Sequence, residues 1–312
     1  MRIIRDPQFI DPADRGAAAA IGNFDGVHLG HQAVIDLTRL AAAKIDAPLG
    51  VMTFEPHPRA YFHHDAAPFR LMNAEARANR LDKLGVKRLY EVPFNAVLAA
   101  LPPEDFAREI IVDALGLKHV VVGSDFCFGK DRAGKATDLA AFGEAMGFGV
   151  TVAQMLTTDD VRISSTAIRD ALSEGDARAA AAMLGHWHRL EGAVIRGEQR
   201  GRDLGYPTAN MSIDGLHPPR FGVYAVKCDV LDGPHAGSYN GAASIGIRPM
   251  FGENEANCET YIFDFKGDLY GAPISVALVE FLRPELNFTS IDNLIVQMDK
   301  DCDMARDILS RV

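Results

Sequence analysis

The chain has 312 residues, a formal net charge of −10 at neutral pH, 48% hydrophobic and 24% charged residues. This length favours two domains, and the composition is that of an ordinary globular protein with ample core. An acidic chain lacks the basic face that nonspecific nucleic-acid binding needs, so we expect no nucleic-acid partner. The sequence has no apolar run of membrane-spanning length, no signal-peptide pattern, and four scattered cysteines without metal-site spacing. We therefore expect a cytoplasmic protein with reduced thiols and no membrane contact.

The first half of the chain alternates short apolar runs with helical periods. We expect strands at residues 17–21, 48–54, 88–94, 119–124 and 149–155, and helices from residue 29 and at 73–84, 102–115 and 137–147. This alternation predicts an α/β domain with a doubly wound parallel sheet covered by helices on both faces. Ligands of such sheets bind beyond the carboxyl ends of the strands. In the first helix, Leu37 and Leu40 belong to the apolar stripe that we expect to be buried.

A glycine-rich turn joins the first expected strand to the first expected helix. From Ile21 to His31 the sequence is Ile-Gly-Asn-Phe-Asp-Gly-Val-His-Leu-Gly-His. Such a turn presents unpaired backbone N–H groups and the positive end of the helix dipole, which suits a phosphate. His28 and His31 are three residues apart, so on a first helical turn they share a face and can act on one phosphoryl group. Taken alone, the turn is weak evidence, because many such turns bind nothing.

Two later segments add candidate nucleotide contacts. Residues 123–129, Gly-Ser-Asp-Phe-Cys-Phe-Gly, follow a strand and bring Asp125 to the expected ligand edge, while their phenylalanines are expected in the core. Residues 163–169, Ile-Ser-Ser-Thr-Ala-Ile-Arg, start a helix with two good cap residues. Arg169 follows one turn later and can donate two hydrogen bonds to phosphate oxygens. On this segment alone, an ordinary capped helix with a surface arginine is the simpler interpretation.

The pattern changes near residues 185–188, where we place the boundary between a domain of residues 1–185 and one of residues 186–312. Beyond it the chain shows short strands with turns until a final helix. We expect strands at 190–196, 222–231, 239–245, 258–264 and 275–282, and a helix at 291–309. This spacing predicts a small antiparallel β-barrel with a terminal helix.

A glycine-rich segment carries the chemistry of the second half. Residues 201–210 are Gly-Arg-Asp-Leu-Gly-Tyr-Pro-Thr-Ala-Asn. Gly197, Gly201 and Gly205 predict a flexible lid, to which Arg196, Arg200 and Arg202 give positive charge. Thr208 and Asn210 alternate along one strand face, so a hydroxyl and an amide oxygen can jointly hold a hard cation such as Mg²⁺. A polar edge strand is the alternative interpretation. Glu259 lies in an otherwise apolar strand, where a charge is costly unless it faces a polar site.

These motifs together resemble one known family. The turn at 22–31 is similar to the signature of the HxGH nucleotidyltransferases, and in its full form it resembles the bacterial bifunctional riboflavin kinase/FAD synthetases. Residues 163–169 resemble the element that holds the ATP triphosphate in that superfamily, and residues 201–210 resemble the riboflavin kinase motif. The further matching elements are Phe221-Gly-Val-Tyr, Ile245-Gly-Ile-Arg-Pro, Glu259-Thr-Tyr-Ile-Phe-Asp, Asp268-Leu-Tyr-Gly and Phe281-Leu-Arg. The chain departs from the family pattern at Cys127, where arginine is common, and at Met250, where threonine is usual.

The resemblance, which covers nearly the whole chain, implies phosphorylation of riboflavin to FMN by ATP in the second half. It implies adenylylation of FMN to FAD, with release of pyrophosphate, in the first. Its implied partners are riboflavin, FMN, FAD and ATP, with Mg²⁺ as cofactor. The implied catalytic residues are Glu259 for the kinase and His28 and His31 for the adenylyltransferase. The implied ATP-binding residues of the adenylyltransferase are Gly22, Asn23, Phe24, Gly30, Asp125, Ser164, Ser165, Thr166 and Arg169. Those that would bind ATP or flavin in the kinase are Gly197, Arg202, Gly205, Tyr206, Pro207 and Arg283, with Thr208 and Asn210 for the metal.

Two alternatives stay open on the sequence. One is an adenylyltransferase that acts on another phosphorylated small molecule, which the first half alone allows. The other is a flavin- or nucleotide-binding regulator without catalysis, against which the intact His28, His31, Glu259 and Asp268 count. The sequence also leaves weak homo-oligomer formation open.

Overall fold

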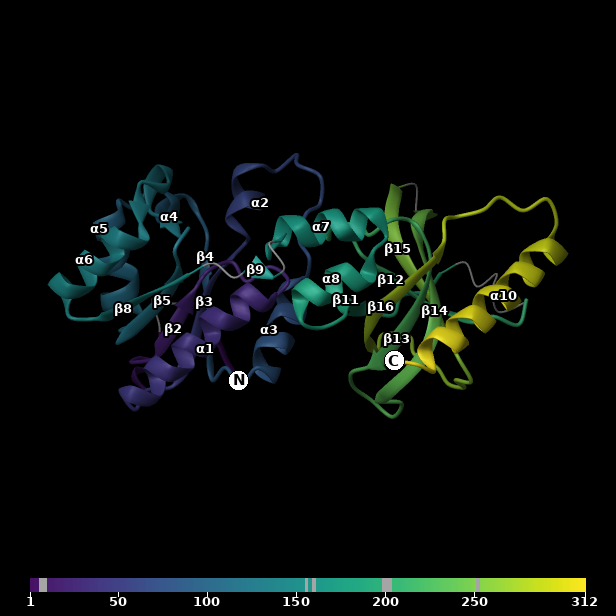
Figure 1. Cartoon of the computed structure of the whole chain (residues 1–312), viewed down its shortest axis with the longest axis horizontal. Helices are drawn as coiled ribbons and strands as arrows, with labels where there is room; N and C mark the ends of the chain where they lie inside the picture. Colours follow the sequence, from purple (N-terminus) through teal and green to yellow (C-terminus); the bar gives the residue numbers. More distant parts are fainter. Residues whose placement is uncertain (6–9, 155–156, 159–160, 198–203, 251–252) are drawn as a thin grey trace. The chain divides into compact units, whose positions relative to one another are not determined.

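The computed structural model describes residues 1–5, 10–154, 157–158, 161–197, 204–250 and 253–312 (Figure 1). Its contacts divide the chain into two compact units. Unit 1 consists of residues 1–66 and 77–163, and unit 2 of residues 67–76 and 164–312.

Unit 1 is built on a six-stranded sheet with the order β1-β4-β3-β2-β5-β8, in which every neighbouring pair is parallel. The strands are β1 (Arg2–Ile4), β2 (Ala18–Ile21), β3 (Leu49–Glu55), β4 (Arg88–Pro93), β5 (His119–Gly123) and β8 (Gly149–Ala153). The central strand β2 has the sequence Ala-Ala-Ala-Ile and is buried throughout, as a strand packed on both faces must be. The predicted parallel sheet is confirmed, although its edge strand β1 was not expected.

Helices cover both faces of this sheet. Helix α1 (Leu29–Lys44) packs on β2 and β5, while the π-helix η3 (Phe106–Ala114) and helix α6 (Ala136–Met146) bury apolar side chains in the core cluster of the other face. The remaining helices of the first half are α2 (Pro58–Phe62), α3 (Ala74–Lys83), α4 (Ala96–Ala100), α5 (Pro103–Asp105), and the 3₁₀ helices η2 (Pro12–Asp14) and η4 (Lys130–Arg132). The short strands β6 (Cys127–Phe128) and β7 (Gly134–Lys135) pair with each other, as do β9 (Thr157–Thr158) and β10 (Val161–Arg162).

The buried face of α1 differs from the predicted one. Leu37 is 37% and Leu40 61% exposed, whereas Ile35, Thr38 and Ala42 are buried. Thr38 can be buried because its hydroxyl donates to a backbone carbonyl one turn earlier, at 2.7 Å. The small side chains of this face allow the helix to approach the alanine-rich strand β2 closely, so packing volume decided the face rather than hydrophobicity.

Unit 2 contains a six-stranded antiparallel sheet with the order β11-β16-β13-β14-β15-β12. The strands are β11 (His188–Ala193), β12 (Thr208–Ser212), β13 (Gly222–Val230), β14 (Gly237–Met250), β15 (Glu253–Ile262) and β16 (Pro273–Arg283). The backbone N–H of Ile195, just beyond β11, donates to the carbonyl of Asn210 on β12 at 2.8 Å. This contact joins the two edges, so the sheet forms the predicted small barrel.

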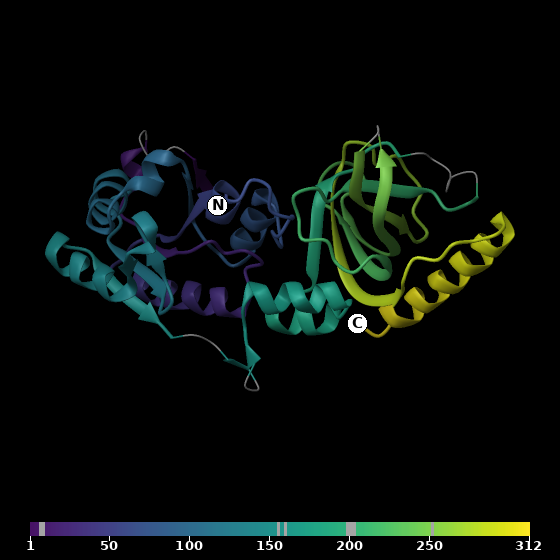
Figure 2. The ribbon, with the colours of Figure 1, turned by 90° about the horizontal axis from the view of Figure 1, so that it is seen from above.

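Three helices pack on the barrel of unit 2. Helices α7 (Ser165–Glu174) and α8 (Ala177–Leu184) lie side by side (Figure 2). Arg178 of α8 pairs with Glu280 of β16. Helix α8 contacts β11 and β16, and α7 packs against α8. Both helices therefore belong to the compact unit of the barrel, which includes the chain from Ser164 onward. The predicted division at residues 185/186 concerns the functional domains and stays a prediction. Helix α10 (Ile291–Leu309) has the predicted bounds, and the hydroxyl of Ser290 caps it by accepting from the Asn293 N–H at 3.2 Å.

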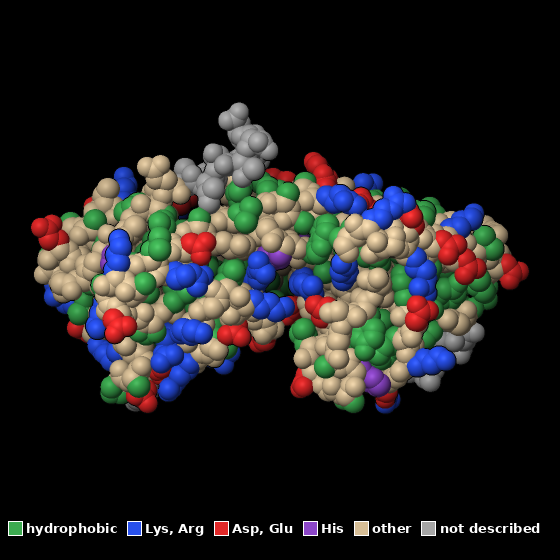
Figure 3. All heavy atoms as spheres, turned by 60° about the horizontal axis from the view of Figure 1, so that its bottom comes forward, with side chains coloured by type: hydrophobic (Ala, Val, Ile, Leu, Met, Phe, Trp, Pro, Cys, Tyr) green, Lys and Arg blue, Asp and Glu red, His purple; other side chains and the backbone are tan. Residues whose placement is uncertain are grey.

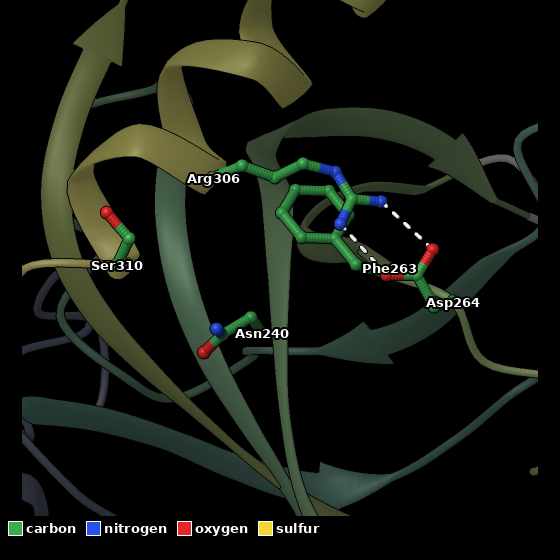
Figure 4. Close-up of a pocket in the computed structure, with 5 residues that line it drawn as sticks. All are labelled: Asn240, Phe263, Asp264, Arg306 and Ser310. Carbon is green, nitrogen blue, oxygen red and sulfur yellow. Dashed lines mark hydrogen bonds and ion pairs between the residues drawn. The ribbon is translucent and has the colours of Figure 1, made fainter.

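The last turns of α10 border a pocket of about 310 Å³ on the barrel, lined by Asn240, Phe263, Asp264, Arg306 and Ser310 (Figure 4). Arg306 donates to both carboxylate oxygens of Asp264, at 2.9 and 3.2 Å, and lies 4.2 Å from the centre of the Phe263 ring. The hydrogen bonds from Arg306 hold the pKa of Asp264 below its usual value. Because the carboxylate is exposed to water, this ion pair fixes the orientation of Arg306 more than it stabilises the fold.

A buried histidine lies in the first strand of the barrel. His188 is 1% exposed, and its Nε2 has no hydrogen-bond partner among the described residues. Burial, and then the nearby imidazoles of His186 and His217, lower the pKa of His188 to about 3. The folded protein therefore keeps this side chain neutral throughout the mildly acidic range.

We expect His188 to make unit 2 less stable in mild acid. Between its unfolded pKa of 6.5 and its folded pKa of about 3, only the unfolded chain binds the proton, so the free energy of unfolding falls as pH drops through this window. Replacing His188→Leu removes the effect, and the loss of stability between pH 7 and pH 5 shrinks by about 2 kcal/mol. Urea unfolding followed by the fluorescence of Trp187, the single tryptophan, measures this. An unchanged pH dependence in the variant would contradict it.

Candidate active sites

The turn between β2 and α1 is built from left-handed backbone. Gly26 has φ +86°, and the non-glycine residues Phe24 and Val27 have φ +52° and +44°. Such conformations are unfavourable for L-residues and persist only where the surrounding structure enforces them. Phe24 is enforced by burial, with 1% exposure and its ring centre 5.1 Å from that of His31. The sharp turn lets α1 begin immediately behind the carboxyl end of the central strand.

His28 and His31 stack on each other at the start of α1. Their ring centres are 3.6 Å apart and their planes 17° from parallel. The Nδ1 of His28 accepts a hydrogen bond from the backbone N–H of His31 at 3.3 Å, which caps the helix. Because Nδ1 is the acceptor, neutral His28 carries its proton on Nε2. A Cβ at Gly30 would lie 3.1 Å from the His28 ring, so a larger residue would crowd this arrangement.

The environment keeps His31 neutral at neutral pH in the free protein. Burial and then the charge of His28 lower the pKa of His31 well below its usual value, and its Nδ1 has no hydrogen-bond partner in the described part of the chain. A phosphate anion beside the rings would act in the opposite direction, because an opposite charge favours protonated imidazole. The pair can therefore take up positive charge when a polyphosphate binds.

The other predicted residues of this turn have structural roles that the contacts define. The backbone N–H of Gly22 donates to the carbonyl of Met52 at 3.1 Å, which continues the sheet. The carbonyl of Asn23 accepts from the hydroxyl of Thr53 at 3.2 Å. Both hydrogen bonds join the turn to β3, so the pairing of β2 with β3 fixes the position of the turn at the carboxyl end of the sheet.

The segment after β5 contains Asp125, a predicted nucleotide contact, and two phenylalanines that were expected in the core. Asp125 is exposed at the carboxyl end of β5. The rings of Phe126 and Phe128 stack at 5.5 Å, and Phe128 is buried in the main core cluster of unit 1 with Phe126 packed against it. The expectation that these phenylalanines fill the core is confirmed.

The predicted phosphate-binding helix start forms the N-terminus of α7 in unit 2. Ser164 is the N-cap, and its hydroxyl accepts from the backbone N–H of Ala167 at 3.2 Å, so Ser165 and Thr166 open the helix. The Nε of Arg169 donates to the carbonyl of Phe69 at 2.5 Å, and the guanidinium lies 5.6 Å from the centre of the Phe69 ring. The Arg169 side chain is therefore held in place by a segment one hundred residues earlier in the chain.

On the barrel, strand pairing brings the predicted metal and base residues together. Asn210 of β12 is paired with Glu259 of β15, and directly opposite residues present their side chains on the same face of the sheet. The amide nitrogen of Asn210 lies 3.4 Å from the Thr208 hydroxyl, and its amide oxygen accepts from Asn257 at 3.2 Å. A Cβ at Gly197 would lie 2.7 Å from the Asn210 amide, so only glycine fits there.

Two further predicted residues contact helix α10. The hydroxyl of Tyr206 donates to Asp299, and this hydrogen bond is the main reason that the pKa of Tyr206 is raised. Arg283 donates to both carboxylate oxygens of the buried Asp301, at 3.0 and 2.7 Å. These contacts anchor α10 to the barrel.

The rest of the predicted lid is only partly described. Gly205 has φ +87° and Pro207 directly precedes β12, which gives a tight turn into the strand. Arg202 lies outside the described residues. No local sequence pattern marks the support that Phe69 gives to Arg169 or that Asn257 gives to Asn210, because these contacts join segments far apart in the chain.

Comparison with known proteins gives two family matches. A FAD synthetase family matches residues 10–167, and a riboflavin kinase family matches residues 184–309. Proteins described as bifunctional riboflavin kinase/FMN adenylyltransferases match over almost the whole chain. That of Pseudomonas fluorescens is 39% identical over 98% of this chain and 97% of its own length, and that of Escherichia coli is 37% identical over 96% of each. The chain belongs to this family.

A solved structure shares the fold of nearly the whole chain. A crystal structure described as a macrolide-efflux protein from Streptococcus pneumoniae is 31% identical, covers 97% of this chain and 98% of its own, and has a TM-score of 0.83. In the part of this chain that the structure describes, no helix has the length and apolar character that a membrane crossing needs.

The stacked histidines predict a coupled titration. Replacing His28→Gln keeps a polar side chain of similar length but removes a positive charge beside His31, so the pKa of His31 rises. It stays below 6.5, because burial is the larger cause. Ring resonances followed by NMR against pH measure the shift. His119, whose pKa is lowered by burial and by Lys44, is the internal control and should not move. If the pKa of His31 does not change, the charge of His28 does not influence the titration of His31.

Proposed function

We propose that this member of the family catalyses both reactions: ATP phosphorylates riboflavin to FMN, and a second ATP adenylylates FMN to FAD. The supporting observation is that one chain keeps both sets of reactive side chains, the stacked His28 and His31 and the paired Asn210 and Glu259. Relatives described as bifunctional enzymes match it over nearly their whole length. A regulator without catalysis would have no need of Glu259 on the same sheet face as the proposed metal-binding residues.

For adenylyl transfer, we propose that the start of α1 binds ATP phosphates. The positive end of the helix dipole and the two imidazoles then face the charge that develops as the FMN phosphate attacks the α-phosphorus and pyrophosphate leaves. No protein nucleophile is needed, because the FMN phosphate is already an anion. On the family resemblance, Ser164, Ser165, Thr166 and Arg169 also bind ATP phosphate, and Gly22, Asn23, Phe24, Gly30 and Asp125 form the rest of the nucleotide-binding set.

For the kinase step, we propose Glu259 as the general base. The ribityl 5′-hydroxyl of riboflavin must lose its proton as it attacks the γ-phosphorus of ATP, and a carboxylate is the natural acceptor. Asp264 is a poorer candidate, since its two oxygens are occupied by Arg306. The resemblance adds Gly197, Arg202, Gly205, Tyr206, Pro207 and Arg283 as residues around the ATP and flavin.

We propose that Thr208 and Asn210 hold Mg²⁺ in the kinase site. Each carries an oxygen of the kind that this cation prefers, and they lie two residues apart on one face of β12. The atom of Asn210 within 3.4 Å of the Thr208 hydroxyl is the amide nitrogen, so the amide would have to turn its oxygen from Asn257 toward the ion. Among the residues that the structure describes, no cluster of three or more His, Cys, Asp or Glu side chains could hold a metal. We propose that the ATP phosphates, whose negative charge the ion would neutralise, complete its coordination.

The remaining predictions about partners and location fit this function. On the face drawn in Figure 3, acidic and basic side chains are interspersed. We propose small-molecule partners, with no nucleic-acid and no membrane partner. The functional domains proposed are residues 1–185 and 186–312. A cytoplasmic location and weak homo-oligomer formation stay proposals.

The direct test is to incubate the protein with riboflavin, ATP and Mg²⁺ and to follow FMN and FAD by chromatography. We expect FMN first and FAD afterwards. Supplying a panel of other phosphorylated acceptors in place of FMN separates FAD synthesis from an adenylyltransferase of different specificity.

We expect the double replacement His28→Ala and His31→Ala to abolish FAD formation from supplied FMN. The imidazoles that stabilise the phosphoryl charge are lost, while the barrel that carries Glu259 is untouched. Riboflavin phosphorylation by the same protein should stay close to that of the parent and shows that the variant is folded. A double variant that adenylylates FMN at the parental rate would remove these residues from the mechanism.

We expect Glu259→Gln to lower the kinase rate by about 10² or more, the usual scale for loss of a general base. The amide keeps the size of the side chain but cannot accept the proton. FAD synthesis from supplied FMN should persist, since its reactive residues are elsewhere in the chain. If riboflavin is still phosphorylated within a few-fold of the parental rate, the base is another group, and Asp268 is the next to replace.

A further inference from the structure

A short segment of the second half of the chain holds the helix that carries Arg169. Residues 217–220, His-Pro-Pro-Arg, connect β12 to β13 and lie within the part that matches the riboflavin kinase family. We call this segment the clamp. Helix α7, which it contacts, begins at the end of the FAD synthetase match.

The first clamp residue contacts α7 at Arg169 itself. The Nε2 of His217 lies 3.0 Å from the backbone carbonyl of Arg169 and 3.1 Å from the hydroxyl of Ser173. The backbone N–H of His217 donates to the carbonyl of Arg70 at 2.8 Å. Arg70 follows Phe69, whose carbonyl accepts from the Arg169 Nε. His217 therefore joins the backbone of Arg169 to the segment that holds the Arg169 side chain.

The last clamp residue contacts the carboxyl end of α7. The backbone N–H of Arg220 donates to the carbonyl of Leu172 at 2.8 Å, and its Nη1 donates to the carbonyl of Glu174 at 3.2 Å. Both carbonyls belong to the last turn of α7, where a cation is favourable. The Leu172 carbonyl also accepts from the N–H of the C-cap Gly175 at 3.1 Å, so Arg220 adds a second donor to the end of the helix. The helix ends at Gly175, with φ +84°, where a Cβ would lie 3.0 Å from the Arg220 side chain. The fit therefore requires glycine.

The clamp is itself fixed to the barrel. The carbonyl of Arg220 accepts from the hydroxyl of Tyr224 at 2.6 Å, and Tyr224 is 1% exposed on β13. The Arg220 guanidinium lies 4.7 Å from the centre of the Phe281 ring, which in turn contacts the Tyr224 ring. The two prolines between His217 and Arg220 further restrict the backbone. The position of α7 thus follows the position of the barrel wall.

We propose that His217 and Arg220 are positioning residues for FMN adenylylation. Acting through α7, they hold Arg169 and the capped helix start in the orientation that binds ATP phosphate. The kinase half of the sequence thereby contributes to the affinity of the other reaction for ATP. This proposal rests on the proposed function, because it assumes that Arg169 binds ATP during adenylyl transfer.

The test measures both reactions on the full-length chain carrying His217→Ala or Arg220→Met. Methionine keeps an unbranched stem over Phe281 but removes the guanidinium donors. We expect KM for ATP in the adenylylation of supplied FMN to rise about tenfold in each variant, the scale for one lost hydrogen bond in such a network. The kcat of that reaction and the kinase constants should stay within about twofold. His217→Gln, whose amide can donate to the Arg169 carbonyl, should recover most of the parental KM.

The matched control is Arg178→Met, which removes an arginine of the neighbouring helix α8 that pairs with Glu280 but not with α7. It should leave KM for ATP unchanged. The proposal is overturned if Arg220→Met and His217→Ala leave KM for ATP at the parental value, or if they impair both reactions equally. A parent protein that makes no FAD from FMN and ATP would overturn the proposed function instead.

Discussion

The stacking of His28 on His31 depends on one backbone constraint, the left-handed turn that joins β2 to α1. Strand β2 is a buried run of small residues, so α1 can pack closely against it directly after the turn. Parallel pairing on both sides of β2 then places the turn at the carboxyl edge of the sheet, where helix N-termini and ligands meet in this class of fold. The chemistry of the first half therefore follows from packing at the centre of unit 1.

A different constraint organises the barrel. Asn210 and Glu259 meet because β12 pairs with β15 in a defined register, and a shift by one residue would send the two side chains to opposite faces. That register is fixed by burial of alternate residues such as Met211 and Cys258, which cannot face water without loss of the core. Gly197 completes the arrangement by leaving room for the Asn210 amide. In this unit the face that carries Asn210 and Glu259 is therefore the reverse side of a hydrophobic core.

Helix α7 lies at the boundary between the two family matches in the sequence. It carries a motif of the FAD synthetase match but is packed with α8 against the barrel. Its N-terminus is specified locally by the Ser164 cap, whereas its side-chain orientation depends on Phe69 and on the clamp. The family match and the compact units therefore divide the chain at different residues: the FAD synthetase match includes the start of α7, whereas the contacts of α7 assign it to unit 2.

The sequence by itself determined five of the six strands of the parallel sheet, the barrel, the bounds of α10 and the capped start of α7, because periodicity and capping act within a few residues. It did not predict the edge strand β1. The family motifs likewise predicted which side chains are candidates for catalysis and for ligand binding. Only the tertiary structure decided which face of α1 is buried, since close approach to β2 favoured Thr38 and Ala42 over Leu37 and Leu40. It alone decided that Arg169 is held by Phe69 and His217, because contacts between such distant segments form only when the elements between them pack.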